Sequence, residues 1–182
     1  MLDQPNEWVI EELGDGQWKV YVALDEPIEI KTISLSKPVD GIKAADAKNL
    51  EISNIHIEGF GANGIYIDGA ENVVMKNVTI AKIEQFGVAL NKISQSVDIS
   101  TSQLSNTRRG AITLLDSNNA DIMIDGNRIE RVGYDDYALG SSRGQVAAIT
   151  AGSYAITATR NQIDEAAAFG MVFGPGSHIS HN

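Results

Sequence analysis

Glycine recurs at a fixed interval in the middle of the chain, and this interval constrains the fold more than any other feature. Gly41, Gly64, Gly87 and Gly110 are each 23 residues apart, and each begins a similar apolar stretch. A period in this range is typical of a solenoid, whose units cannot bury an apolar face alone and must stack on one another. We therefore expect residues 39–182 to form a stacked coil that carries any functional site on its outside.

The spacing within each repeat predicts strands. Apolar residues alternate, as in Ile65 and Ile67 or Val73 and Met75, and alternation with β-branched side chains is typical of strands. Each repeat holds about three short runs of such residues, separated by turns rich in Asn, Gly, Asp and Ser. Regularly spaced leucines and a helical half, which a leucine-rich repeat needs, are both absent. The fold class is therefore all-β, a parallel β-helix in which one repeat forms one coil.

The same positions recur from repeat to repeat, which predicts the core and one corner of the coil. Asparagine near a corner tolerates the left-handed backbone, and stacked amides can hydrogen-bond from coil to coil. These corner residues are Asn54, Asn77, Asn127 and Asn161. The predicted core columns are Leu50, Val73, Val97 and Ile122; Ile52, Met75, Ile99 and Ile124; and Ile57, Ile80, Leu104, Ile129 and Ile163.

Two segments depart from the repeat. The interval between Ile129 and Ile163 is about half as long again as the earlier intervals of that column, and the extra residues lie in an insertion at Gly133–Gly144. The N-terminal runs WVIEEL and WKVYV flank a Gly-Asp-Gly turn and predict a β-hairpin. We therefore divide the chain into a hairpin with its transition, 1–38, and the β-helix, 39–182.

Composition excludes several classes of partner. The 182 residues carry a formal net charge of -10, so a nucleic-acid phosphate backbone would be repelled. There is no cysteine and no apolar run long enough to span a membrane. A signal peptide is absent from this segment, and the last repeat stops part-way through at SHISHN. We expect these residues to belong to a longer protein with further coils.

Several stretches carry a resemblance to a known group. They are the N-terminal EWVIEELGDGQWKVYV and the later RRGAITL, GNRIERVG and AAFGMVFGPGSHISHN. With them, the chain resembles bacterial right-handed parallel β-helix proteins of the pectin-lyase-like superfamily, among them secreted β-helical proteins assigned as glycoside hydrolases. The resemblance covers nearly the whole chain and implies a right-handed coil. It is less specific for activity, because this superfamily contains hydrolases, lyases, epimerases and non-catalytic spike proteins.

The resemblance implies a carbohydrate-active module that is secreted or at the cell surface. The activity that we expect first is glycoside hydrolysis of an extracellular polysaccharide or oligosaccharide. The alternatives are a polysaccharide lyase or epimerase, and a non-catalytic carbohydrate-binding or structural solenoid. The Asn-Thr-Asp, Gly-His-Gly and Arg-Ile-Lys signatures of polygalacturonases are absent, as is the Asp-Pro-His-Glu run of alginate epimerases.

The insertion is the first candidate site, because a long loop beside a solenoid face can wall a groove. Aromatic rings can stack on sugars, and carboxylates and arginine can bind their hydroxyl or acidic groups. The alternative is an ordinary solvated loop. The candidate residues here are Asp135 and Asp136 for catalysis, and Tyr134, Tyr137 and Arg143 for substrate binding.

A second candidate comes from register. Asp68, Asn91 and Asp116 each follow the strand after a repeat glycine, so they are expected at one edge of stacked coils. With coils ~4.8 Å apart, Asp68 and Asp116 would lie roughly 9–10 Å apart. That separation is at the long end of the ~6.5–9.5 Å used by inverting glycosidases. Equally, aspartate is a common turn residue at the end of a strand.

Arg109 is the remaining candidate, either as a ligand for an acidic sugar or as a partner of nearby carboxylates. Histidine is a weak signal in this chain. His56 lies between two inward isoleucines and should point outward, and the spacing of His178 and His181 does not make a zinc site without a helix. We expect no metal and no cofactor.

Overall fold

The computed structural model describes residues 8–14, 17–22, 39–117, 120–133 and 147–182. The chain divides into two compact units, residues 1–35 and residues 36–182. In the first unit, β1 (Trp8–Gly14) and β2 (Gln17–Val22) pair antiparallel, from Trp8 opposite Val22 to Gly14 opposite Gln17. The predicted hairpin is confirmed.

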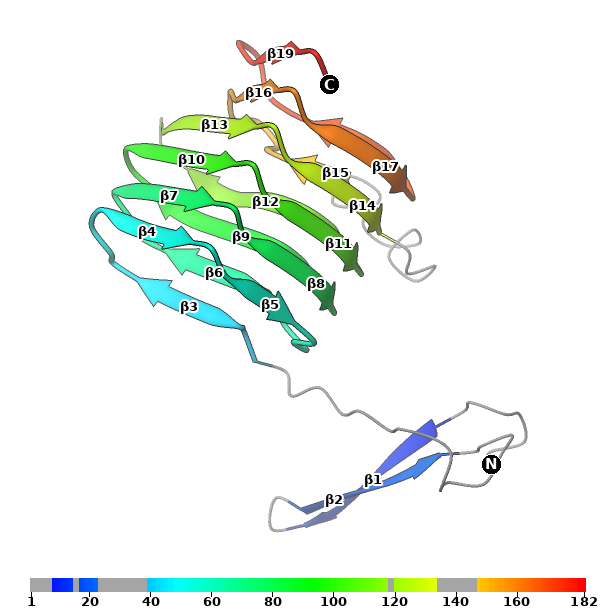
Figure 1. The fold of residues 1–182 in the computed structure, drawn as a ribbon. Helices are drawn as coiled ribbons and strands as arrows, with labels where there is room; N and C mark the ends of the chain where they lie inside the picture. The colour runs from blue at the N-terminus through cyan, green and yellow to red at the C-terminus, as the bar shows by residue number, and fades with distance from the viewer. Residues whose placement is uncertain (1–7, 15–16, 23–38, 118–119, 134–146) are drawn as a thin grey trace. The chain divides into compact units, whose positions relative to one another are not determined.

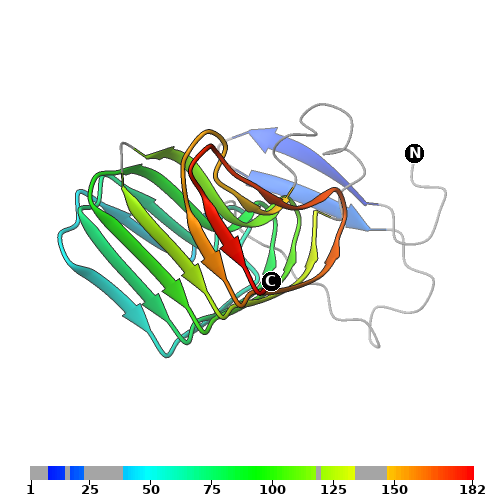
Figure 2. The ribbon, with the colours of Figure 1, turned by 90° about the horizontal axis from the view of Figure 1, so that it is seen from above.

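The second unit is a parallel β-helix of three sheets, as predicted (Figure 1). Each strand pairs with the third strand before it and the third strand after it, so every turn of the coil adds one strand to each sheet. Figures 1 and 2 show these turns stacked in chain order, from cyan at β3 to red at β19.

The strands of each sheet are as follows. Sheet 1 contains β3 (Ile42–Ala45), β6 (Ile65–Asp68), β9 (Phe86–Ile93), β12 (Gly110–Ser117), β15 (Ala147–Thr150) and β18 (Phe169–Val172). Sheet 2 contains β4 (Leu50–Ser53), β7 (Asn72–Lys76), β10 (Ser96–Ser100), β13 (Asp121–Asp125), β16 (Thr157–Thr159) and β19 (His178–Ser180). Sheet 3 contains β5 (His56–Glu58), β8 (Thr79–Ile83), β11 (Gln103–Thr107), β14 (Arg128–Val132) and β17 (Gln162–Ala166).

The core lies inside the coil and consists of the predicted columns. Val73 pairs with Leu50 and Val97, and Ile80 pairs with Ile57 and Leu104. These side chains are buried, apart from the partly buried Leu50 of the first coil, because alternate residues of each strand point inward and meet the same position of the next coil. The three predicted columns are confirmed.

The glycine column differs from the prediction in its fourth member. Gly110 pairs with Phe86, so Ala111 and not Gly110 lies opposite Gly87. The corner between β9 and β10 contains one residue more than the same corner of the preceding coil. The pairing is therefore shifted by one residue by the time Val97 pairs with Val73. A constant interval in the sequence therefore does not guarantee a constant register.

The corner asparagines form two columns instead of one. Asn54 and Asn77 have the left-handed backbone that we predicted, and the Asn77 amide donates to Asn54 at 2.8 Å. In later coils other residues have the left-handed backbone at this corner. Asn127 and Asn161 come one position after that residue, and their side chains are buried. Asn127 Nδ2 donates to Asn161 Oδ1 at 3.0 Å, so the predicted stacking of amides holds in both columns.

Candidate functional site

The predicted column of Asp68, Asn91 and Asp116 exists at the end of sheet 1. Asp68 pairs with Asn91, and Asn91 pairs with Asp116, in three successive coils. A bulge in β12 makes this register possible, because Leu114 pairs with Leu90 while Leu115 has no partner and is 48% exposed. Such an extra residue re-aims the side chain that follows it. Without the bulge, Leu115 instead of Asp116 would face Asn91.

Polar contacts hold both carboxylates of this column. Asn91 Nδ2 donates to Asp68 Oδ1 at 2.9 Å, and Lys92 Nζ lies 3.7 Å from the same oxygen. The Tyr154 hydroxyl donates to Asp116 Oδ1 at 3.0 Å. Both aspartates remain partly exposed. The column therefore places two oriented carboxylates on the surface, two coil spacings or roughly 9–10 Å apart.

Tyr154 is a residue that the sequence did not point to. It lies after β15, and the insertion separates it from Asp116 along the chain, which hides their proximity. Register counting does not find it, because Tyr154 lies in the turn between β15 and β16 and not on a strand that pairs with β12.

Of the remaining predicted site residues, Tyr134, Asp135, Asp136, Tyr137 and Arg143 lie outside the described residues. Along the chain, the segment that contains them runs from the end of β14 to the start of β15. Asp116 lies near the end of β12, roughly 20 Å beyond Gly110.

Arg109 immediately precedes β12. Its side chain is exposed, and no carboxylate of the described residues lies within ion-pair distance. The neighbouring Arg108 instead pairs with Glu84 of the preceding coil at 2.8 Å. The pairing with nearby acids that we considered for Arg109 is thus made by Arg108.

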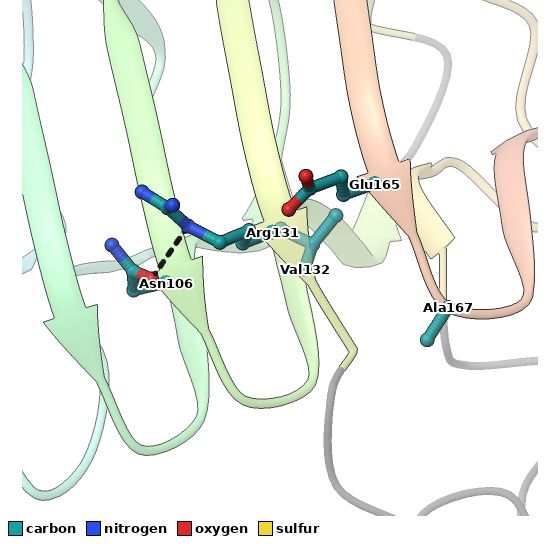
Figure 3. A pocket seen from close by; sticks show the side chains of 5 residues that line it. All are labelled: Asn106, Arg131, Val132, Glu165 and Ala167. Carbon is teal, nitrogen blue, oxygen red and sulfur yellow. Dashed lines mark hydrogen bonds between the residues drawn. The ribbon is translucent and has the colours of Figure 1, made fainter.

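A pocket of about 350 Å³ lies at the end of sheet 3 (Figure 3). Its side chains come from three successive coils, and nothing in the sequence singled them out. Arg131 Nε donates to Asn106 Oδ1 at 3.0 Å, and Arg131 Nη2 lies 3.3 Å from Glu130 Oε1. The lining residues are Asn106, Arg131, Val132, Glu165 and Ala167.

Two carboxyl groups elsewhere on the coil have lowered pKa values. Hydrogen bonds from Lys82 and His56 lower the pKa of Glu58, and a hydrogen bond from the Thr159 hydroxyl, with help from Arg160, lowers that of Asp125. His56 points outward, as predicted, and contacts Glu58 at 2.9 Å. A lowered pKa is typical of a carboxylate in an ion pair and not of a general acid.

The described residues contain no cluster of three or more histidine, aspartate or glutamate side chains that could hold a metal ion. Within the same residues, no helix is long and apolar enough to cross a membrane.

Comparison with known proteins identifies the coil. A family described as "Right handed beta helix region" matches residues 40–182, which include every strand of the three parallel sheets. No curated protein and no solved structure matches the chain significantly.

Proposed function

Because the chain belongs to the right-handed β-helix family, we propose that it is a carbohydrate-active module that hydrolyses an extracellular polysaccharide. It would act as a secreted or cell-surface protein, where such polymers are found. Asp68 and Asp116 are the pair of carboxylates in this proposal, and Asn91 between them is a substrate-binding residue. The insertion residues and Arg109 would bind parts of the polymer further along sheet 1.

The observation that carries the proposal is the register of Asp68, Asn91 and Asp116 in successive coils. Glycoside hydrolysis needs one carboxyl group to protonate the leaving oxygen and a second to activate water or attack the sugar. Two coil spacings separate this pair by roughly 9–10 Å, which leaves room for a water molecule on the face of the sugar opposite the acid. The contacts from Asn91 and Tyr154 orient the two carboxylates before substrate binds.

The same geometry disfavours one form of the lyase alternative. A lyase that uses Arg109 to bind a uronate and Asp116 to remove its proton needs both groups at one sugar ring. Arg109 and Asp116 lie at opposite ends of β12, roughly 20 Å apart. A single ring cannot contact both.

A product analysis over neutral and acidic plant, algal and bacterial polysaccharides tests the proposal. We expect new reducing ends without the ultraviolet absorbance of an unsaturated uronate, which a lyase would generate. Unsaturated products would instead establish the lyase, and tight binding without any new ends would establish a non-catalytic solenoid.

The separation of the pair also predicts the stereochemistry of the product. At roughly 9–10 Å the enzyme should invert the anomeric centre, because direct attack and retention need carboxyl groups only ~5–5.5 Å apart. Proton NMR of the first product formed distinguishes the two anomers. A retained configuration would rule out Asp68 and Asp116 as the acting pair.

A further inference from the structure

The pocket at the end of sheet 3 is separate from the Asp68–Asp116 column. It lies where β11, β14 and β17 end, whereas the column lies at the far end of the sheet 1 strands. Its volume of about 350 Å³ falls at the lower end of the ~300–1,000 Å³ of small-ligand sites. A pocket of this size suits one or two units of a chain molecule and not a whole polymer.

The lining combines an apolar surface with a polar rim. The apolar part of the lining consists of the buried Val132 at its base and the exposed Ala167 of the next coil. Asn106, Arg131 and Glu165 add an amide, a guanidinium and a carboxylate to the lining (Figure 3). A sugar ring has this same division, with C–H groups on its faces and hydroxyl groups at its edge.

The polar groups keep hydrogen-bonding capacity for a ligand. The Arg131 side chain is 51% exposed, and its contacts with Asn106 and Glu130 use only part of its five N–H donors. The Glu165 carboxylate has no hydrogen-bond or ion-pair partner among the described residues. One hydroxyl group can therefore accept from Arg131 while another donates to Glu165.

Charge selects between neutral and acidic sugars. The chain has a net charge of -10; Glu130 precedes Arg131 on β14, and Glu165 lies opposite Arg131 on the next coil. These two carboxylates outnumber the single guanidinium of Arg131, so the local charge is net negative and disfavours an acidic sugar relative to a neutral one. We propose that this pocket is a second saccharide-binding site, specific for a neutral sugar unit and independent of the hydrolysis proposed for sheet 1.

The backbone of the pocket allows variants that keep the fold. Arg131 and Glu165 both have left-handed backbones, with φ of 51° and 55°. Asparagine tolerates this conformation, and Asn106 already occupies it in the preceding coil with φ of 52°. Arg131→Asn and Glu165→Asn therefore remove the charged groups without new strain. Lys82→Asn is the matched control, because Lys82 has φ of 54° in the same column outside the pocket.

Isothermal titration calorimetry in an Asp116→Asn background tests the site while keeping the probes intact. The probes are cellotetraose, xylotetraose, mannotetraose and maltotetraose, with tetragalacturonate as the acidic comparison. At least one neutral probe should bind, and Arg131→Asn and Glu165→Asn should each weaken binding by about tenfold, the loss expected for one charged hydrogen bond. Lys82→Asn should leave the affinity unchanged.

Three results would overturn the proposal. They are binding of tetragalacturonate alone, binding of none of the five probes at millimolar concentration, and neutral binding that neither pocket variant weakens. Because the readout is binding in a variant disabled at Asp116, the outcome does not depend on whether sheet 1 hydrolyses any polymer.

Discussion

Asn161 shows how a single buried polar residue connects neighbouring coils. Its side chain is 2% exposed, and its amide donates to Ile124 O and to Asn182 Oδ1, each at 2.9 Å. Its own carbonyl oxygen accepts from the backbone and the side chain of Asn127, at 3.1 and 3.0 Å. Every side-chain group of this amide is thus satisfied inside the coil, as a buried polar residue requires.

Replacing Asn161 should destabilise the coil more than replacing a partly exposed asparagine. Asn161→Ala removes hydrogen bonds from buried groups of Ile124 and Asn127, and we expect a loss of about 2–4 kcal/mol of unfolding free energy. Asn72→Ala is the control, since Asn72 is partly exposed and its hydrogen bonds with Asn49 and Ser96 are not fully buried. Urea denaturation of the two variants provides the comparison. Equal losses of unfolding free energy would contradict a structural role for the buried column of Asn127 and Asn161.

Asp125 predicts a pH dependence of stability. The hydrogen bond from Thr159, with help from Arg160, lowers its folded pKa below the ordinary 3.8. The charged form therefore stabilises the folded state above pH ~4, and this contribution disappears as the pH falls through the lowered pKa. In thermal unfolding from pH 7 to pH 2, Asp125→Asn should reduce the melting temperature near neutral pH and converge with the wild type at the acid end.

The Thr159→Val variant provides the control for this explanation. It keeps the shape of the side chain and removes the hydroxyl donor, so it should show part of the same convergence. If the difference between wild type and Asp125→Asn stayed constant across the whole range, the titration of Asp125 would not be its cause.

At the scale of the strands, the glycine column of sheet 1 brings neighbouring coils close together. A Cβ atom on Gly64 would lie 2.6 Å from the carbonyl oxygen of Gly87 and 2.7 Å from Ile80 Cγ2. Contacts this short force either the backbone or the buried isoleucine to move. Gly170 occupies the same column in the last described coil, where a Cβ atom would meet nothing within 4 Å.

The two glycines therefore form a matched test. Gly64→Ala should lower the unfolding free energy by about 1–3 kcal/mol through overpacking. Gly170→Ala should remain within about 0.5 kcal/mol of the wild type. Both substitutions reduce the conformational entropy of the unfolded chain by the same amount. The difference between their unfolding free energies therefore measures the cost of placing a methyl group between the closely packed coils at Gly64. Equal effects in chemical denaturation would show that the column tolerates a methyl group.

The strands also show which parts of the structure the sequence can predict. The core columns followed directly from the alternation of apolar residues, because an inward position must recur in every coil. Gly110 and the later asparagines were placed one position off, because coils of unequal length change the register at single corners. The repeat period describes the average length of a coil, so it does not show at which corner a single extra residue is inserted.

On the scale of the whole molecule, the site was only partly predictable. The pairing of Asp68, Asn91 and Asp116 could be counted along the chain, since each lies on the next strand of the same sheet. Tyr154 and the pocket of Arg131 and Glu165 bring together residues on either side of the insertion. The register of Arg131 with Glu165 follows from the predicted column of Ile129 and Ile163, but the contact of Tyr154 with Asp116 depends on the corner after β15, which the local pattern does not encode.

The most direct test of the proposed function compares three aspartate variants on the polysaccharide that the wild type cleaves. Asp68→Asn and Asp116→Asn remove the proposed pair, and Asp164→Asn changes a carboxylate on sheet 3, where it bonds with Gln162. The rate of reducing-end release should fall about 10²–10⁴-fold in each of the first two variants, the usual contribution of a general acid or base. It should stay at the wild-type rate in Asp164→Asn. Full activity in Asp68→Asn and Asp116→Asn would contradict the assignment of the two carboxylates as the catalytic pair.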